Sequence, residues 1–113
     1  ELIENSQTAI DNFLGSTYDM GHMLYTGSGG LAQVRSVCAN SGRARAVSGT
    51  FTGSPVGLVH ENIIRHEMGH QFGARHTYNS DACAGPPTAS SAVEPGGGTT
   101  IMSYAGFALV HQT

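Results

Sequence analysis

Three histidines and one glutamate stand at spacings that suit a metal centre. His66, Glu67 and His70 share one segment, and Gly73 and His76 follow closely. In a helix, residues four apart lie about 40° apart on adjacent turns, so His66 and His70 can reach one ion. Glu67 projects to the side of that ion, where a base would act on a water molecule. A turn at Gly73 would bring His76 to the same ion and leave a fourth position open.

A site with three imidazole ligands and an open position is of the catalytic kind, because structural zinc sites usually close all four positions, most often with cysteine. The other histidines, His22, His60 and His111, lack this spacing, and we expect all three to be structural. Asp19 and Asp81 do not fall in a calcium-loop pattern, so the sequence leaves a calcium requirement open.

Composition narrows the class of protein further. The 113 residues are 39% hydrophobic and 12% charged, with a formal net charge of −3 and sixteen glycines. All five basic residues are arginine, and they form no basic stripe for nucleic acid. No apolar run approaches the ~20 residues of a membrane span. We expect one domain over residues 1–113, acting as a monomer, with many tight turns.

The metal-binding pattern requires a helix to carry it. From residue 57 to residue 72, apolar residues recur at helical spacing, with Ile63 on one face and Met68 and Phe72 on another. A helix that is apolar on two faces should be buried on both sides, and it should therefore run through the middle of the domain. Gly73 supplies a left-handed end.

Shorter elements are predicted around this helix. Residues 5–14 form a helix that Asn5 or Ser6 caps and Gly15 ends. Strands are predicted over 18–26, 31–38 and 44–48, and residues 77–100 are irregular before an apolar stretch over 101–110. The fold class is therefore α/β in the mixed, α+β sense.

The pattern HExxHxxGxxH over residues 66–76 resembles that of the metzincin zinc endopeptidases. Their second hallmark is a methionine-containing turn beneath the metal, and the segment 101–104 with Met102 is similar to it. The resemblance implies a zincin-type catalytic domain, with a small twisted mixed sheet, a central active-site helix and a Met-turn. In it, Met102 forms an apolar floor and Gly73 places the third histidine.

Within the metzincins, the chain is most similar to the reprolysins, or adamalysins, and to their bacterial secreted relatives. Residues 30–38 resemble the reprolysin upper edge strand and the cysteine after it, and residues 18–24 resemble the preceding strand. Thr77 stands where reprolysins usually carry Asp, and Tyr104 replaces their Pro, as in astacins and serralysins. The family's first two strands and its C-terminal helix have no counterpart, so we expect an incomplete catalytic domain.

The resemblance implies a zinc-dependent metalloendopeptidase that hydrolyses extended protein or peptide substrates. One catalytic Zn²⁺ would be held by His66, His70 and His76, and Glu67 would be the general base toward a zinc-activated water. Tyr104 would lie near the zinc as a further ligand or as a hydrogen-bond donor to the oxyanion; packing in the lower core is its alternative role. A zinc-stabilised binding module and a non-peptide zinc hydrolase remain the alternative functions.

An extended substrate would pair with the predicted edge strand. Gly30, Leu31, Ala32, Gln33 and Val34 offer backbone N–H and C=O groups there, and nothing charged interrupts them.

The cysteine pair bears on the compartment. On count alone, Cys38 and Cys83 fit either one disulfide or two thiols. We predict a Cys38–Cys83 disulfide, which would tie the end of the edge strand to the loop after His76, although the reprolysin cysteine at this place pairs further downstream. Because the chain opens at Glu1 without an initiator Met, we expect a processed piece of a secreted protein, with any export signal upstream.

Overall fold

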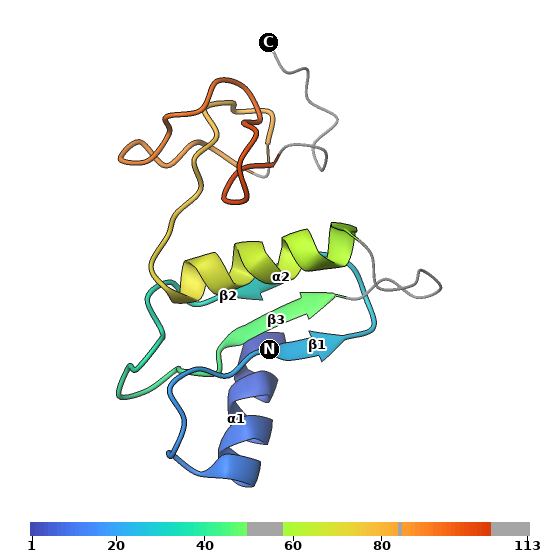
Figure 1. Cartoon of the computed structure of the whole chain (residues 1–113), viewed down its shortest axis with the longest axis vertical. Helices are drawn as coiled ribbons and strands as arrows, with labels where there is room; N and C mark the ends of the chain where they lie inside the picture. The colour runs from blue at the N-terminus through green and yellow to red at the C-terminus, as the bar shows by residue number, and fades with distance from the viewer. Residues whose placement is uncertain (50–57, 84, 105–113) are drawn as a thin grey trace. The chain divides into compact units, whose positions relative to one another are not determined.

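The computed structural model describes residues 1–49, 58–83 and 85–104 (Figure 1). By its internal contacts the chain divides into two units, Glu1–Ala74 and Arg75–Thr113. In the described ranges, two helices and a three-stranded mixed sheet are present, and all belong to the first unit. The predicted mixed class is thus confirmed, whereas a single domain over 1–113 stays a prediction. Within those ranges, no helix combines the length and the apolar character that crossing a membrane requires.

The sheet contains the strands β1 (Met23–Tyr25), β2 (Gly30–Ala32) and β3 (Ala46–Gly49) in the order β1-β3-β2. The central strand β3 pairs with β1 in parallel and with β2 antiparallel. All four residues of β3 are buried, as a central strand requires. β2 lies at an edge of the sheet, where one side of its backbone has no strand partner among the described residues.

The strands are shorter than the sequence predicts. The prediction of a strand over 31–38 is wrong beyond Ala32, because the backbone leaves the extended region there. Arg35 has a φ of 62° and Cys38 a φ of 56°, both in the left-handed region, where a β-ladder cannot continue. Similarly, the predicted strand over 18–26 is limited to β1, and that over 44–48 is shifted to β3.

The helix α1 (Leu2–Leu14) begins earlier than predicted and ends at Gly15, whose φ of 64° is left-handed. The predicted capping role of Asn5 or Ser6 is wrong, because both residues lie within the helix and Glu1 occupies the N-cap position. Ser6 is buried instead, and its hydroxyl donates to the carbonyl of Ala46 at 3.2 Å. This hydrogen bond ties α1 to the central strand.

The helix α2 (Leu58–Gln71) confirms the predicted helix, although it ends one residue before Phe72, and residue 57 lies outside the described residues. It contacts β2 and β3 (Figure 1). Gly73 has a φ of 104°. Its N–H donates to the carbonyl of His70 at 2.8 Å, and the N–H of Ala74 donates to the carbonyl of Gly69 at 2.9 Å. These two bonds form a Schellman motif, so the predicted glycine ending is confirmed.

The edge-strand segment also caps α2. The N–H of Arg35 donates to the carbonyl of His70 at 2.9 Å, and the N–H groups of Ser36 and Val37 donate to that of Gln71 at 2.9 and 3.2 Å. The carbonyls that a helix leaves without partners in its last turn are thereby satisfied. The turn that ends β2 therefore fixes the end of α2 that carries His70.

The prediction that apolar residues bury two faces of α2 is wrong. Phe72 is 67% exposed, while a fully buried Gln71 lies near the C-terminal end of the helix. The Gln71 amide donates to the carbonyl of Gly21 at 2.8 Å and accepts from Nδ1 of His22 at 2.9 Å. The other ring nitrogen of His22 pairs with the hydroxyl of Ser48 at 2.9 Å.

This buried polar network holds the helix on the sheet, because each buried group in it finds a hydrogen-bond partner. Burial lowers the pKa of His22, so the ring stays neutral and serves as a structural link. This placement agrees with the structural role expected of His22.

Candidate metal centre

His66 and His70 lie one turn apart on α2, and each side chain is 8% exposed. Their ring centroids are 4.8 Å apart and the rings meet edge to face. The Nδ1 atom of His70 lies 2.8 Å from the carbonyl oxygen of Ala74. Because a carbonyl only accepts hydrogen bonds, this contact places the proton on Nδ1 and the lone pair on Nε2. Metal-ligating histidines are generally oriented in this way, with the N–H of the other ring nitrogen donated to a carbonyl or carboxylate oxygen.

Glu67 lies beside the two histidines and is 6% exposed. Burial raises the pKa of its carboxyl from the usual 4.5 to about 7. A carboxyl poised near neutrality is suited to proton transfer at neutral pH. The spacing of the motif predicts the position of Glu67 next to His66 on the helix. The burial of Glu67 depends on the tertiary fold and could not be predicted from that spacing.

Gly30, the first residue of β2, packs directly against this carboxylate. A β-carbon added at Gly30 would lie 2.6 Å from Cγ and 2.7 Å from Oε1 of Glu67. Such distances are too short for any real contact, so a side chain at this position would displace Glu67. The edge strand and the candidate base are therefore in van der Waals contact only because residue 30 is glycine.

His76 belongs to the second unit, where it lies in an aromatic cluster. Its ring centroid is 5.3 Å from that of Tyr78 and 5.0 Å from that of Tyr104. The hydroxyl of Tyr104 lies 3.3 Å from Nε2 of His76. The backbone is held as well, because the Ser91 hydroxyl donates to the carbonyl of His76 at 2.6 Å.

Met102 lies in a turn of the same unit, closed by a hydrogen bond of 3.0 Å from the N–H of Ser103 to the carbonyl of Thr100. The carbonyl of Met102 accepts from the N–H of Thr77 at 3.1 Å. The Met-containing turn and the residue after His76 are thus joined through the backbone.

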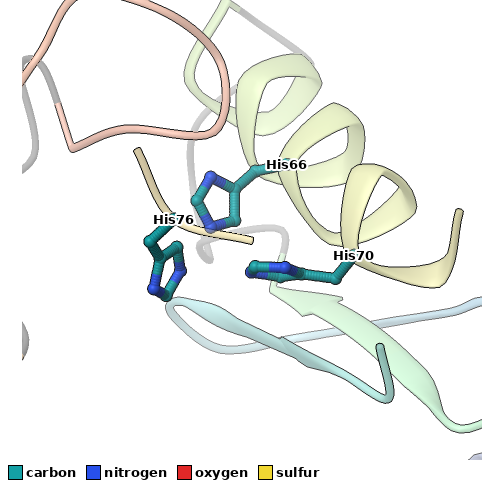
Figure 2. Close-up of side chains that lie close together, drawn as sticks. All are labelled: His66, His70 and His76. Atoms are coloured by element: carbon teal, nitrogen blue, oxygen red, sulfur yellow. The ribbon is translucent and has the colours of Figure 1, made fainter. Parts of the chain in front are cut away.

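Figure 2 shows His66, His70 and His76 with their rings close together. One ring nitrogen from each histidine can be chosen so that all three lie within 4.8 Å of one another. Three neutral imidazoles with no cysteine suit a zinc ion that keeps a further position open. The tautomer that Ala74 imposes on His70 agrees with this donor set.

The geometry agrees with a comparison to known families. Residues 2–112 match the family described as metallo-peptidase family M12B, reprolysin-like. The chain therefore belongs to this family of zinc-dependent metallopeptidases, and the resemblance drawn from the sequence is confirmed. No curated protein and no solved structure matches the chain.

The predicted substrate strand is shorter than residues 30–34. Only Gly30, Leu31 and Ala32 form strand β2, and Val34 lies in the following turn. The N–H of Gln33 donates to the carbonyl of Arg45 at 2.8 Å, so it faces the sheet rather than a substrate. The predicted edge strand is therefore limited to the three residues of β2.

The two cysteines are free thiols in the structure, one in each unit. Cys38 is exposed, in the left-handed turn after β2, and Cys83 is partly exposed. Their predicted pairing stays a prediction.

Three residues around this site were missed by sequence reasoning. Gln71 anchors α2, Tyr78 packs on the ring of His76, and Glu94 accepts a hydrogen bond from the residue after His76. Gln71 lies next to the motif and Tyr78 follows it closely, yet neither residue type signals such a role. Glu94 stands alone in a stretch rich in Gly and Pro, and only its partners in space reveal it.

Proposed function

We propose that this chain is a zinc-dependent metalloendopeptidase that hydrolyses peptide bonds of extended protein substrates. The observation that carries the proposal is the buried carboxylate of Glu67 on the same helix as His66 and His70, with His76 as the third imidazole. Membership of a metallopeptidase family supports it.

In this proposal His66, His70 and His76 hold the ion. When bound, zinc would polarise the scissile carbonyl and lower the pKa of a water molecule toward about 7. Glu67 takes the proton of the attacking water and then delivers it to the leaving amine. Gly73 permits the turn that precedes His76, and Met102 forms the apolar floor below the imidazoles.

The first test is zinc content together with activity. We expect one zinc per chain by elemental analysis, and loss of hydrolysis of a generic protein substrate on treatment with a chelator, reversed by added zinc. Because each histidine must be neutral to bind, zinc affinity should fall as the pH drops through about 6. His70→Ala should lose the metal, whereas Glu61→Gln, in an exposed ion pair on the same helix, should keep it.

The outcomes of this test separate the alternatives. Protein purified without chelator that holds no stoichiometric metal would overturn the proposal. Zinc bound without turnover of any peptide would favour a zinc-stabilised binding module. Turnover of small amides or esters without peptides would favour a non-peptide zinc hydrolase.

We propose a catalytic role for Tyr104 as a donor to the oxyanion or as a further ligand. Its hydroxyl lies 3.3 Å from Nε2 of His76, which supports a position beside the ion. Tyr104→Phe should lower kcat by ~10²-fold, which is the effect typical of losing one oxyanion donor, while zinc content stays unchanged. The ring would still pack on Tyr78, 5.0 Å away, so stability should change little.

The matched control for Tyr104→Phe is Tyr18→Phe. Tyr18 lies in the other unit, and its hydroxyl is hydrogen-bonded to Asp11. If Tyr104→Phe and Tyr18→Phe turn over substrate equally well, the catalytic role is wrong and Tyr104 serves only in packing.

Secretion is proposed together with this activity, because reprolysins are commonly extracellular. A monomer without nucleic-acid partners and a Cys38–Cys83 disulfide complete the proposal. Finding two free thiols by intact mass after non-reducing purification would contradict the disulfide.

A further inference from the structure

The carboxylate of Glu94 collects an unusual number of hydrogen bonds. The N–H groups of Thr99 and Thr100 donate to it at 2.9 and 3.0 Å, and the hydroxyl of Thr100 donates at 2.6 Å. The hydroxyl of Thr77 donates to Oε2 of Glu94, the same oxygen that accepts from the hydroxyl of Thr100. These bonds, led by those from the side chains of Thr100 and Thr77, lower the pKa of Glu94 from 4.5 to about 2. The group is therefore ionised and accepts only.

The donors come from two separate segments that flank the proposed site. Thr77 directly follows His76, whereas Thr99 and Thr100 directly precede the turn of Met102. A single carboxylate thus joins the chain after the third histidine to the chain before the methionine turn. Both segments and Glu94 belong to the same unit.

The backbone at Thr77 is fixed on both sides. Its carbonyl accepts from the N–H of Glu94 at 2.9 Å, and its N–H donates to the carbonyl of Met102 at 3.1 Å. Tyr78 forms a parallel bridge with Glu94. Because its hydroxyl is also hydrogen-bonded, the backbone N–H, the backbone carbonyl and the side chain of Thr77 all have partners. The backbone directly after His76 is therefore fixed.

Glycine at position 98 lets the 94–100 turn close next to Glu94. A β-carbon at Gly98 would lie 3.1 Å from Cβ of Glu94 and would collide with the side chain of Ser103. Gly98 has a φ of 71°, which favours glycine as well. The hydroxyl of Ser103 donates to the carbonyl of Gly97 at 2.7 Å. The Glu94 carboxylate is therefore bonded across the 94–100 turn, and its hydrogen bonds with Thr99 and Thr100 are exposed.

We propose that Glu94 is the positioning residue for His76, acting through the hydroxyl and the backbone of Thr77. This inference rests on the proposed zinc site. It also gives a role to Thr77, whose hydroxyl donates a hydrogen bond to the carboxylate of Glu94. Residues that orient metal ligands typically affect metal affinity by about 10–100-fold.

The test measures zinc affinity of the full chain by competition with a chromophoric chelator. We expect Glu94→Ala and Thr77→Val each to weaken zinc binding by about 10-fold or more. Glu94→Gln, which keeps one acceptor oxygen, should fall between wild type and Glu94→Ala. The double variant should bind zinc no more weakly than Glu94→Ala, because both residues act through one contact.

A matched control is Glu61→Gln, which removes a charge from an exposed ion pair with Arg65 on α2 and should leave zinc affinity unchanged. The visible spectrum of the cobalt-substituted protein adds a second readout, since a misplaced imidazole changes the ligand field while loss of stability alone does not. If Glu94→Ala fails to fold, Glu94→Gln and Thr77→Val carry the test.

Tight zinc binding by wild type together with equal affinity in Glu94→Ala would overturn this inference and leave the proposed function standing. A weakened Glu94→Ala beside an unaffected Thr77→Val would also overturn it, because Glu94 would then only close the 94–100 turn. A wild-type chain that binds no zinc would overturn the proposed function and this inference together.

Discussion

Glu67→Gln should lower kcat for peptide hydrolysis by about 10²–10⁴-fold while zinc stays bound. Gln has nearly the size of Glu but cannot take a proton from water, so the change removes the base without opening a cavity. The buried position of the side chain, 6% exposed, leaves no bulk water to substitute for it. Steady-state kinetics and elemental analysis on the same preparation measure both quantities.

Glu61→Gln is the control for Glu67, because it makes the same chemical change at an exposed position on the same helix. Gly30→Ala provides an independent route to the same effect, since the added methyl group would press on the carboxylate of Glu67. It should reduce kcat more than it raises KM. Near wild-type turnover by Glu67→Gln would show that another group is the base.

Ala32→Pro should raise KM strongly or abolish cleavage of extended peptides, with zinc content unchanged. The N–H of Gly49 donates to the carbonyl of Gly29, and the N–H of Gln33 donates to the carbonyl of Arg45. The hydrogen-bonding groups of residues 29 and 33 therefore face β3. By the alternation of an antiparallel pair, the N–H of Ala32 faces away from the sheet. Proline removes that N–H and its ring obstructs an added strand, at little cost to an edge strand.

Gln33→Pro is the informative comparison, because it removes an N–H that the sheet itself uses. It should lower Tm, whereas Ala32→Pro should not. Ala32→Gly, which keeps the N–H, should have a much smaller effect on KM than Ala32→Pro. If Ala32→Pro cleaves extended peptides with wild-type kcat/KM, substrate is held elsewhere.

Local sequence patterns are sufficient to predict the helix that carries His66 and His70 and the residue that ends it. The spacing of His66, Glu67 and His70 is set by helical periodicity, and Gly73 ends the helix because it tolerates a left-handed φ. These are local properties, which depend on residues within a turn or two of each other. The mixed fold class and the family resemblance followed from the same short-range patterns and were confirmed.

The remaining arrangement depends on contacts that form only when the chain is folded. The burial of Glu67 against Gly30, the polar link from Gln71 to His22, and the position of Glu94 all join residues far apart in the chain. The predicted strand ends and the predicted start of α1 are wrong for a related reason. Ser6 has the residue type of a cap, but its hydroxyl bonds to Ala46 of the sheet. Long-range contacts override local preferences wherever they bury a polar group with a partner.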